Sequence, residues 1–245
     1  MANLNNHDFN LLERLVSSNQ NQTGEFILKY LEHEYDEIIE TDDYIIGIGQ
    51  IPIALVAHMD TVFEDDNLDR GELFYDNKRD VLWNPNGAGF DDKAGIFSIL
   101  KIIENGFLPH VIFTTNEEIG SLGAEILAND MPNMPFEDLK YIIELDRANY
   151  NDCVFYNCMN YKFEDYISSF GFETKMGVRS DICKICPKWR IAGVNLSIGY
   201  RNQHTEYEVL NVDALFSTIS KVKDMLNDAE NLKEHFEYEI VLSDF

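Results

Sequence analysis

The sequence predicts an α/β fold with three layers, α/β/α, in which helices cover both faces of a central mixed, mostly parallel sheet. Two observations lead to this fold class. Segments with the apolar pattern of strands alternate with segments of helical periodicity along the 245 residues. Several strand segments also end in histidine or in acidic residues, which is typical of a site at the carboxyl ends of parallel strands.

The first sixty residues predict two amphipathic helices and the beginning of the sheet. The apolar residues of FNLLERLV (9–16) fall on one helical stripe, and those of GEFILKYLEHEY (24–35) do the same. Strand patterns follow at 37–40, 43–49 and 51–57, and the hydrophilic stretch 63–80 predicts a loop or hairpin.

The segment DDKAGIFSILKIIENG (91–106) carries both end signals of a helix. It begins with aspartates that can cap the first turn, and Gly106 follows its last apolar residue. The remaining elements are predicted as a strand at 110–118, a helix at 121–130, strands at 139–146 and 153–158, a helix at 161–171, a strand at 192–200, a long helix at 211–236 and a strand in the tail at 237–242.

Length, composition and charge limit what the protein can do. A chain of 245 residues with 45% hydrophobic residues can form one sizeable domain, so disorder is not expected. The net charge of −25 argues against nucleic acid and anionic membranes as partners, because both would be repelled. The polar N-terminus lacks the features of a secretory signal, and no apolar run has the length of a membrane span. We expect a cytoplasmic protein.

Four cysteines stand in the second half of the chain: Cys153, Cys158, Cys183 and Cys186. Disulfides are not expected in a cytoplasmic protein. Two interpretations remain open from the residues, ordinary buried thiols and a structural zinc site made of four sulfurs, and the first is favoured.

Imidazole and carboxylate groups recur at strand ends or in adjoining loops of five separate chain segments. They are His58 and Asp60, Asp91 and Asp92, Glu117 and Glu118, Asp146, and His204. Each alone has an ordinary structural explanation, such as a helix cap or a buried histidine. Together they suit zinc or a similar divalent ion. Two Zn²⁺ ions would be neutralised by the carboxylates of Asp91, Glu118 and Asp146 and one bound hydroxide, so such a site can be buried.

The order of these motifs resembles the co-catalytic di-zinc exopeptidase superfamily of aminopeptidases, carboxypeptidases and aminoacylases. The matching pieces are HMDTV, GFDDKAG, TTNEEIGSLGA, ELD, the Ser180–Asp181 pair and NQHTEYE, which together span most of the chain. The resemblance implies two metal ions, most simply zinc with cobalt or manganese as alternatives. It also implies that His58 binds one ion, that Asp91 bridges both, that Glu118 and Asp146 bind one each, and that His204 completes the second.

The same resemblance assigns the general base to Glu117, which would take a proton from the water between the ions and return it to the leaving amine. Adjacent residues on a strand diverge, so Glu117 can face the substrate while Glu118 faces the metal. Side chains two positions apart point the same way, so Asp60 can reach the second ring nitrogen of His58 and orient it.

Further residues receive supporting roles. Thr205 and Glu208 are expected to hold the loop of His204, and Ser180–Asp181 resembles a pocket-wall motif of the aminopeptidase branches. Gly87 and Gly89 are expected to ease the turn into the site, because no glycine-rich phosphate loop follows them.

The chain lacks the inserted domain that many relatives carry. The stretches from His58 to Asp91 and from Asp146 to His204 are both too short for a typical domain of ~100 residues. The prediction is therefore one catalytic domain, 1–245, without a lid or dimerisation domain, in which the loops near 61–90 and 147–193 select the substrate. The sequence does not indicate an oligomeric state.

We expect a small peptide or an amino-acid amide as substrate, and these residues favour an aminopeptidase. A carboxypeptidase, deacylase, amidase or cyclotransferase of the same fold is the alternative, since Arg147, Arg179 and Arg201 are available for a substrate carboxylate. A measured content of one metal ion per chain would favour the interpretation as a cyclotransferase. A binding module without catalysis is disfavoured, because neither the ligands nor the base are missing.

Overall fold

The centre of the computed structural model is an eight-stranded sheet, and the structure describes residues 4–63 and 72–240. In order across the sheet, the strands are β1 (Ile38–Glu40), β2 (Tyr44–Gly47), β6 (Pro109–Thr114), β3 (Ile51–His58), β7 (Tyr141–Arg147), β10 (Gly193–Ser197), β8 (Asp152–Val154) and β9 (Glu173–Thr174). The four central strands β6, β3, β7 and β10 are parallel to one another. On either side of them, β2 and β8 pair in the antiparallel direction. The predicted mixed, mostly parallel sheet is confirmed.

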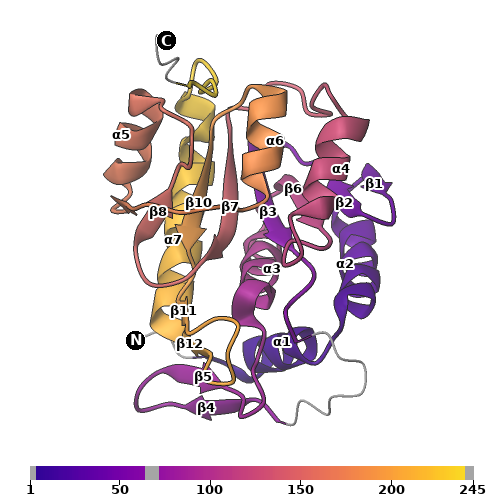
Figure 1. Cartoon of the computed structure of the whole chain (residues 1–245), viewed down its shortest axis with the longest axis vertical. Coiled ribbons are helices and arrows are strands. Elements are labelled where there is room, and N and C mark those ends of the chain that lie inside the picture. Colours follow the sequence, from indigo (N-terminus) through magenta and orange to yellow (C-terminus); the bar gives the residue numbers. More distant parts are fainter. Residues whose placement is uncertain (1–3, 64–71, 241–245) are drawn as a thin grey trace.

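Helices cover both faces of this sheet (Figure 1). They are α1 (Asn6–Val16), α2 (Gln20–Glu34), α3 (Phe90–Glu104), α4 (Leu122–Asp130), α5 (Tyr161–Ser169), α6 (Ile182–Trp189) and α7 (Val212–Asp228), followed by the 3₁₀ helix η1 (Ala229–Asn231). The helices α3 and α7 pack together on one side, and α4 and α6 pack together on the other.

The strand β3 shows how the sequence specifies the three layers. Its residues Ile53, Leu55 and Ala57 belong to the hydrophobic core shared with α3, whereas Ala54 and Val56 belong to the core under α4 and α6. Successive side chains of a strand point to opposite faces, so a continuous apolar run is required where both faces are buried. The three-layer prediction follows from this run and is confirmed.

A second, four-stranded antiparallel sheet lies at one end of the molecule (Figure 1). Its order is β11 (Tyr200–Arg201), β12 (Val209–Asn211), β5 (Val81–Trp83) and β4 (Phe74–Asp76). A loop or hairpin was expected at 63–80, and β4 lies in this stretch and forms a hairpin with β5, which directly follows it. Residues 64–71 of the stretch lie outside the described part of the chain.

The C-terminal prediction was wrong in two respects. The helix α7 ends at Asp228 rather than near residue 236, and Glu237 forms only an isolated bridge with Ile191 instead of a strand. The chain leaves the helix because Phe236 packs against the ring of Tyr141, 6.0 Å between centroids, and its backbone bonds to two neighbouring segments. Residues 241 and 242 of the predicted strand lie outside the described residues.

The helix α6 was not predicted. Its buried residues Ile182, Ile185, Cys186 and Trp189 have helical spacing, but Cys183 and Cys186 were interpreted only as thiols or zinc ligands. In the described part of the chain, none of the helices combines the length and the apolar character that a membrane span requires.

Candidate metal centre

The predicted ligands converge because the strands that carry them are parallel neighbours. His58 ends β3, Asp146 lies near the end of β7, and Glu118 follows β6 by a short turn. Asp91 stands in the first turn of α3, and His204 lies between β11 and β12 of the small sheet. Carboxyl ends of parallel strands meet at one edge of a sheet, so these side chains share one site.

Asp91 lies at the centre of this group. Its Oδ1 atom is 3.1 Å from Nε2 of His58, and its Oδ2 atom is 3.2 Å from Nε2 of His204. The side chain of Asp146 approaches His58 at 3.6 Å, and that of Glu118 approaches His204 at 3.1 Å. The geometry therefore contains two histidine–carboxylate sets that share Asp91.

Burial makes this cluster costly without a cation. Burial and the nearby charge of Asp91 raise the pKa of Glu118 to about 7, and the same two causes raise the pKa of Asp146 well above its usual range. The pKa of Asp91 is lowered in spite of burial, because His204 and His58 donate to its carboxylate. Several buried carboxylates side by side are stable only when positive charge compensates them.

The residues fit divalent metal ions. Both histidines present a ring nitrogen to carboxylate oxygens, which is the donor set that zinc prefers. The Oε1 atom of Glu118 is buried and has no hydrogen-bond partner among the described residues. Ligand atoms of His58, Asp91 and Glu118 all lie within 4.8 Å of one another, which is close enough for a common ion.

Asp92 is also close to His58, but its oxygens are already in use. One accepts the main-chain N–H of Gly95 at 3.0 Å and the other accepts the N–H of His58 at 3.2 Å. This agrees with the expectation that Asp92 caps the helix. The peptide bond between Asp91 and Asp92 is cis.

Asp60 connects three parts of the site. One of its oxygens lies 3.2 Å from Nδ1 of His58 and accepts the main-chain N–H of Glu117 at 3.0 Å. The other oxygen accepts the N–H of Glu118 at 3.0 Å. These contacts hold the pKa of Asp60 below its usual range although burial opposes them. Asp60 thus orients the His58 ring and fixes the loop of the two glutamates.

Glu208, which was expected to hold the loop of His204, ties that loop to the start of α3. Its buried carboxylate accepts the main-chain N–H of Phe90 at 3.0 Å and of Asp91 at 3.1 Å, so it positions the backbone of the central carboxylate. Burial raises the pKa of Glu208 to about 7. Thr205 does stabilise the loop of His204, because its hydroxyl donates to the carbonyl of Asn202.

A second layer of hydrogen bonds surrounds Asp146. The hydroxyl of Tyr200 donates to one of its oxygens and the hydroxyl of Ser180 donates to the other, each at 3.2 Å. The amide of Asn195 donates to Ser180 at 3.0 Å. Tyr200 and Asn195 were not singled out from the sequence, although both stand in the strand pattern predicted at 192–200.

Ser180–Asp181 continues into a buried acidic pair. The main-chain N–H of Asp181 donates to Glu144 at 3.0 Å, and the hydroxyl of Thr114 donates to the Asp181 carboxylate. Burial raises the pKa of Asp181 to about 7 and that of Glu144 well above its usual range. The pair lies behind the cavity wall rather than on it.

Glu117 faces an open cavity of about 580 Å³ beside the cluster. Its Oε1 atom accepts a hydrogen bond from the hydroxyl of Ser121 at 3.0 Å, which leaves its second oxygen available on the cavity side. The cavity is lined by Asp91, Glu117, Glu118, Asp146, Arg147, Ala148, Asn149, Tyr156, Gly177, Val178, Arg179, Asn195, Tyr200, Gln203 and His204. Its volume lies within the ~300–1,000 Å³ of small-molecule sites.

Gly89 is required where the chain enters α3. Its φ of 66° lies in the left-handed region, and a Cβ atom there would come within 2.7 Å of the Thr61 hydroxyl. Gly87, at φ 86°, is equally constrained. Both glycines therefore shape the turn into the site, as expected.

The cysteines do not form a metal site in the described residues. All four are free, and every group of side chains that could hold an ion consists of histidine and carboxylate only. A group outside the centre, made of His7, Asp8 and Glu104, already contains a cation, because the ammonium of Lys101 contacts both acids.

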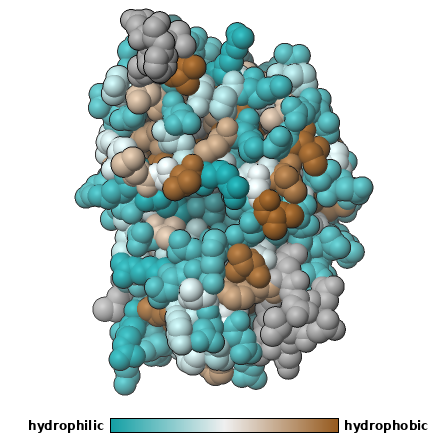
Figure 2. Space-filling view, in the orientation of Figure 1, coloured by the Kyte–Doolittle hydropathy of each residue, from teal (hydrophilic) through white to brown (hydrophobic). Residues whose placement is uncertain are grey.

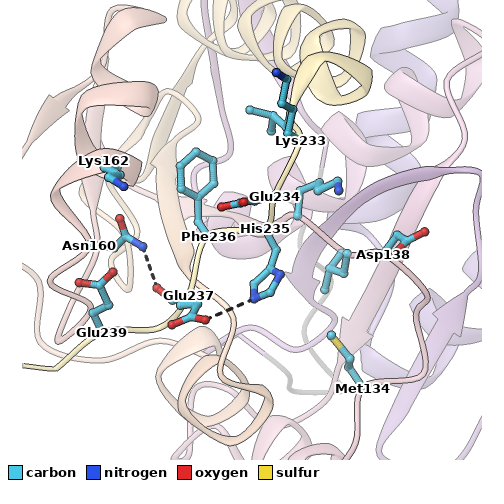
Figure 3. A pocket seen from close by; sticks show the side chains of 13 residues that line it. Met134, Asp138, Asn160, Lys162, Lys233, Glu234, His235, Phe236, Glu237 and Glu239 are labelled. Carbon is cyan, nitrogen blue, oxygen red and sulfur yellow. Dashed lines mark hydrogen bonds and ion pairs between the residues drawn. The ribbon is translucent and has the colours of Figure 1, made fainter.

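A larger cavity of about 960 Å³ lies at the opposite ends of the strands, next to the residues before β7 (Figure 3). Lys162, Lys233 and His235 alternate there with acidic side chains, and His235 lies 3.9 Å from Glu237. The acidic side chains are on the surface and belong to none of the metal-binding groups found among the described residues. The surface seen in the view of Figure 1 is mainly hydrophilic, with several hydrophobic side chains in a diagonal row on the right of the view (Figure 2).

Comparison with known proteins identifies the fold. No protein-family model matches the chain, and no curated protein matches it. Among solved structures, it is similar to a tripeptidase from Staphylococcus aureus, with a TM-score of 0.72, 13% identity, and 92% of this chain and 98% of that chain covered.

Two further solved structures have the same architecture. The aminopeptidase PepT from Bacillus cereus gives a TM-score of 0.70 at 16% identity, with 91% and 98% of the two chains covered. An aminopeptidase from the archaeon Desulfurococcus kamchatkensis gives 0.72 at 13% identity, with 97% and 99% covered. At such low identity these matches establish a shared fold, and the chemistry has to be argued from the site.

Proposed function

We propose that the protein is a metal-dependent aminopeptidase that removes the N-terminal residue from small peptides or amino-acid amides. The observation that carries the proposal is the position of Asp91, whose two oxygens face His58 and His204 at 3.1 and 3.2 Å. A carboxylate shared between two sets of ligands is the arrangement that a pair of metal ions ~3.5–4 Å apart requires.

In this proposal, His58, Asp91 and Asp146 hold one ion, and Asp91, Glu118 and His204 hold the other. The ions are zinc, with cobalt or manganese as alternatives that offer similar coordination. When bound, such a pair lowers the pKa of water and polarises the substrate carbonyl. The protein supplies the geometry, because Asp60 and Glu208 fix the ligands from behind.

Glu117 is the proposed general base. It lies on the cavity wall next to Glu118, and Ser121 holds one of its oxygens in place. Its carboxylate takes a proton from the attacking water while the water oxygen bonds to the carbonyl carbon. When the carbon–nitrogen bond breaks, Glu117 returns this proton to the leaving amine. The second proton of the water stays on the new carboxyl group, so the two products account for both protons.

An aminopeptidase is preferred because Glu117, which lines the cavity and is not assigned to a metal ion, carries a carboxylate that can attract a protonated α-amine. The two structural neighbours named aminopeptidases and the one named a tripeptidase support the same choice. The four free thiols agree with a reducing compartment such as the cytoplasm. We further propose that the chain acts as one catalytic domain, 1–245, without a lid.

Metal analysis combined with a substrate screen tests the proposal. After reconstitution and gel filtration, elemental analysis is expected to find two divalent ions per chain, and chelators are expected to abolish hydrolysis of aminoacyl amides. A protein that binds one ion and releases cyclic products would be a cyclotransferase instead. A chain that takes up no divalent ion would contradict the proposal.

A further inference from the structure

Two arginines line the same cavity as the carboxylate cluster, and the proposed hydrolysis uses neither of them. Arg147 follows Asp146 at the end of β7, and Arg179 precedes the Ser180–Asp181 pair. In a chain of net charge −25, an arginine that borders a cavity would be expected to pair with one of the many carboxylates nearby. The contacts of these two guanidinium groups are therefore informative.

The guanidinium of Arg147 is held in place but incompletely paired. Its side chain is 19% exposed, and its Nη2 atom is 3.8 Å from Asp152, which is too long for a hydrogen bond. Its Nε atom is buried and has no hydrogen-bond partner among the described residues. A guanidinium has five N–H donors, so the terminal nitrogens of Arg147 can still donate to an acceptor that enters the cavity this residue lines.

Arg179 also lines the cavity, near the turn that follows the two glutamates. Its Nη1 atom would be 3.8 Å from a Cβ atom placed on Gly120. It is exposed and forms neither an ion pair nor a hydrogen bond with any residue that the structure describes. The guanidinium is thus free to bind an anion that enters the cavity.

Arg201, the third arginine considered from the sequence, differs from these two. Its guanidinium stacks over the ring of Tyr150 at 4.1 Å, and it is not part of the cavity wall. The lining of the cavity therefore combines the carboxylates of the metal centre with two arginines, Arg147 and Arg179.

We infer that Arg147 and Arg179 bind the C-terminal carboxylate of the substrate, so that the enzyme acts on short unblocked peptides. This inference rests on the proposed function and adds its substrate class. A guanidinium matches a carboxylate with two parallel hydrogen bonds, and Arg147 and Arg179 both line the cavity with this group. A cavity of about 580 Å³ that recognises this group next to the metal centre limits the peptide to a few residues.

The test compares di- and tripeptides with the same peptides carrying a C-terminal amide. The metal-loaded wild-type protein is expected to show a kcat/KM about 10- to 100-fold higher for the free acids, mainly through a lower KM. In Arg179→Ala and Arg147→Ala this ratio should fall towards one. Arg147→Lys keeps the charge without the forked geometry and should retain only part of the preference.

Arg201→Ala is the matched control, because it removes an equal charge outside the cavity and should leave the ratio unchanged. Equal kcat/KM for acid and amide in the wild type would overturn the inference. The same loss of preference in Arg201→Ala would also overturn it, since the effect would then be one of net charge.

A binding measurement separates this inference from the proposed function. Calorimetry with the metal-loaded Glu117→Gln variant should show tighter binding of a peptide acid than of its amide, and Arg179→Ala in that background should remove the difference. Tight acid binding by a protein that hydrolyses neither peptide would contradict the proposed function only. Hydrolysis without any acid preference in binding would contradict the arginine assignment only.

Discussion

The Asp60 carboxylate and the main-chain N–H of Glu117 are joined by a hydrogen bond of 3.0 Å, across 57 positions of sequence. The same carboxylate oxygen faces Nδ1 of His58 at 3.2 Å. The proposed base and a proposed metal ligand are therefore positioned by one buried side chain, and a displacement of Asp60 would move both.

The first prediction concerns Asp60→Asn. An amide can accept through only one of its two terminal atoms, so its NH₂ group would face either an N–H donor or the His58 ring. We expect metal affinity and activity to fall about 10- to 100-fold, as is typical for the loss of a group that orients a ligand. Metal titration and steady-state kinetics measure both quantities, and Asp42→Asn on the surface is the control. Wild-type affinity in Asp60→Asn would contradict the assigned role.

The second prediction concerns Glu117→Gln. The amide has nearly the shape of the carboxylate but cannot take a proton, so kcat should fall by about 10²–10⁴. Both ions should remain bound, because none of the five proposed ligands is altered. Elemental analysis and kinetics on the same sample check this, with the exposed Glu32→Gln as control. Undiminished kcat would exclude Glu117 as the base.

The third prediction concerns Glu208→Gln. The carboxylate accepts two main-chain N–H groups at the start of α3, and an amide NH₂ in its place would leave one of them without an acceptor. The loss should lower the free energy of unfolding by about 1–3 kcal/mol and weaken metal binding through Asp91. Denaturant unfolding of the metal-free protein measures the first effect. Glu206→Gln, exposed in the same loop, should change neither quantity.

The fourth prediction concerns pH and a histidine outside the metal centre. Burial lowers the pKa of His110 to about 4, and its Nδ1 atom accepts the main-chain N–H of Gly49 at 3.1 Å. Between about pH 6.5 and 4 the unfolded chain binds a proton at this position and the folded chain does not. Stability from the neutral ring is therefore complete above pH 6.5 and is lost as the pH falls, by on the order of 3 kcal/mol.

Two measurements check this effect. An NMR titration of the metal-free protein should show one histidine ring that titrates near pH 4, and its resonance should be absent in His110→Gln. Unfolding between pH 7 and 4 should lose less free energy in that variant than in the wild type. A His110 ring that titrates near pH 6.5 would contradict the prediction.

Sequence reasoning was most successful where local pattern and tertiary structure agree. The apolar run of β3 predicts a strand buried on both faces, and the two cores on either side of Leu55 and Val56 explain why the run has no polar interruption. The site residues could be named because metal ligands are of few residue types, mainly histidine and carboxylates. They also follow the predicted strands in the same order as in the superfamily that the sequence resembles. The structure brings all five predicted ligands together, while their roles toward metal remain proposals.

The errors arise where distant contacts decide the local structure. Leu232 and Phe236 continue the spacing of α7, but Phe236 is held by aromatic rings from other elements, so the helix ends at Asp228. The partners of Glu208 lie 117 and 118 positions away, and no local pattern reveals which backbone groups a buried carboxylate reaches. Long-range hydrogen bonds of this kind require coordinates.

The two histidines of the centre differ strongly in exposure, since the His58 side chain is 1% exposed and that of His204 is 50% exposed. His58 belongs to a central strand, whereas His204 lies in a turn of the small sheet. We therefore expect stepwise loading: the cation beside His58 should dissociate slowly, and its companion beside His204 should exchange readily with the medium. Exchange against a different metal would then produce an enzyme with two kinds of ion, in which the buried position beside His58 keeps the original one.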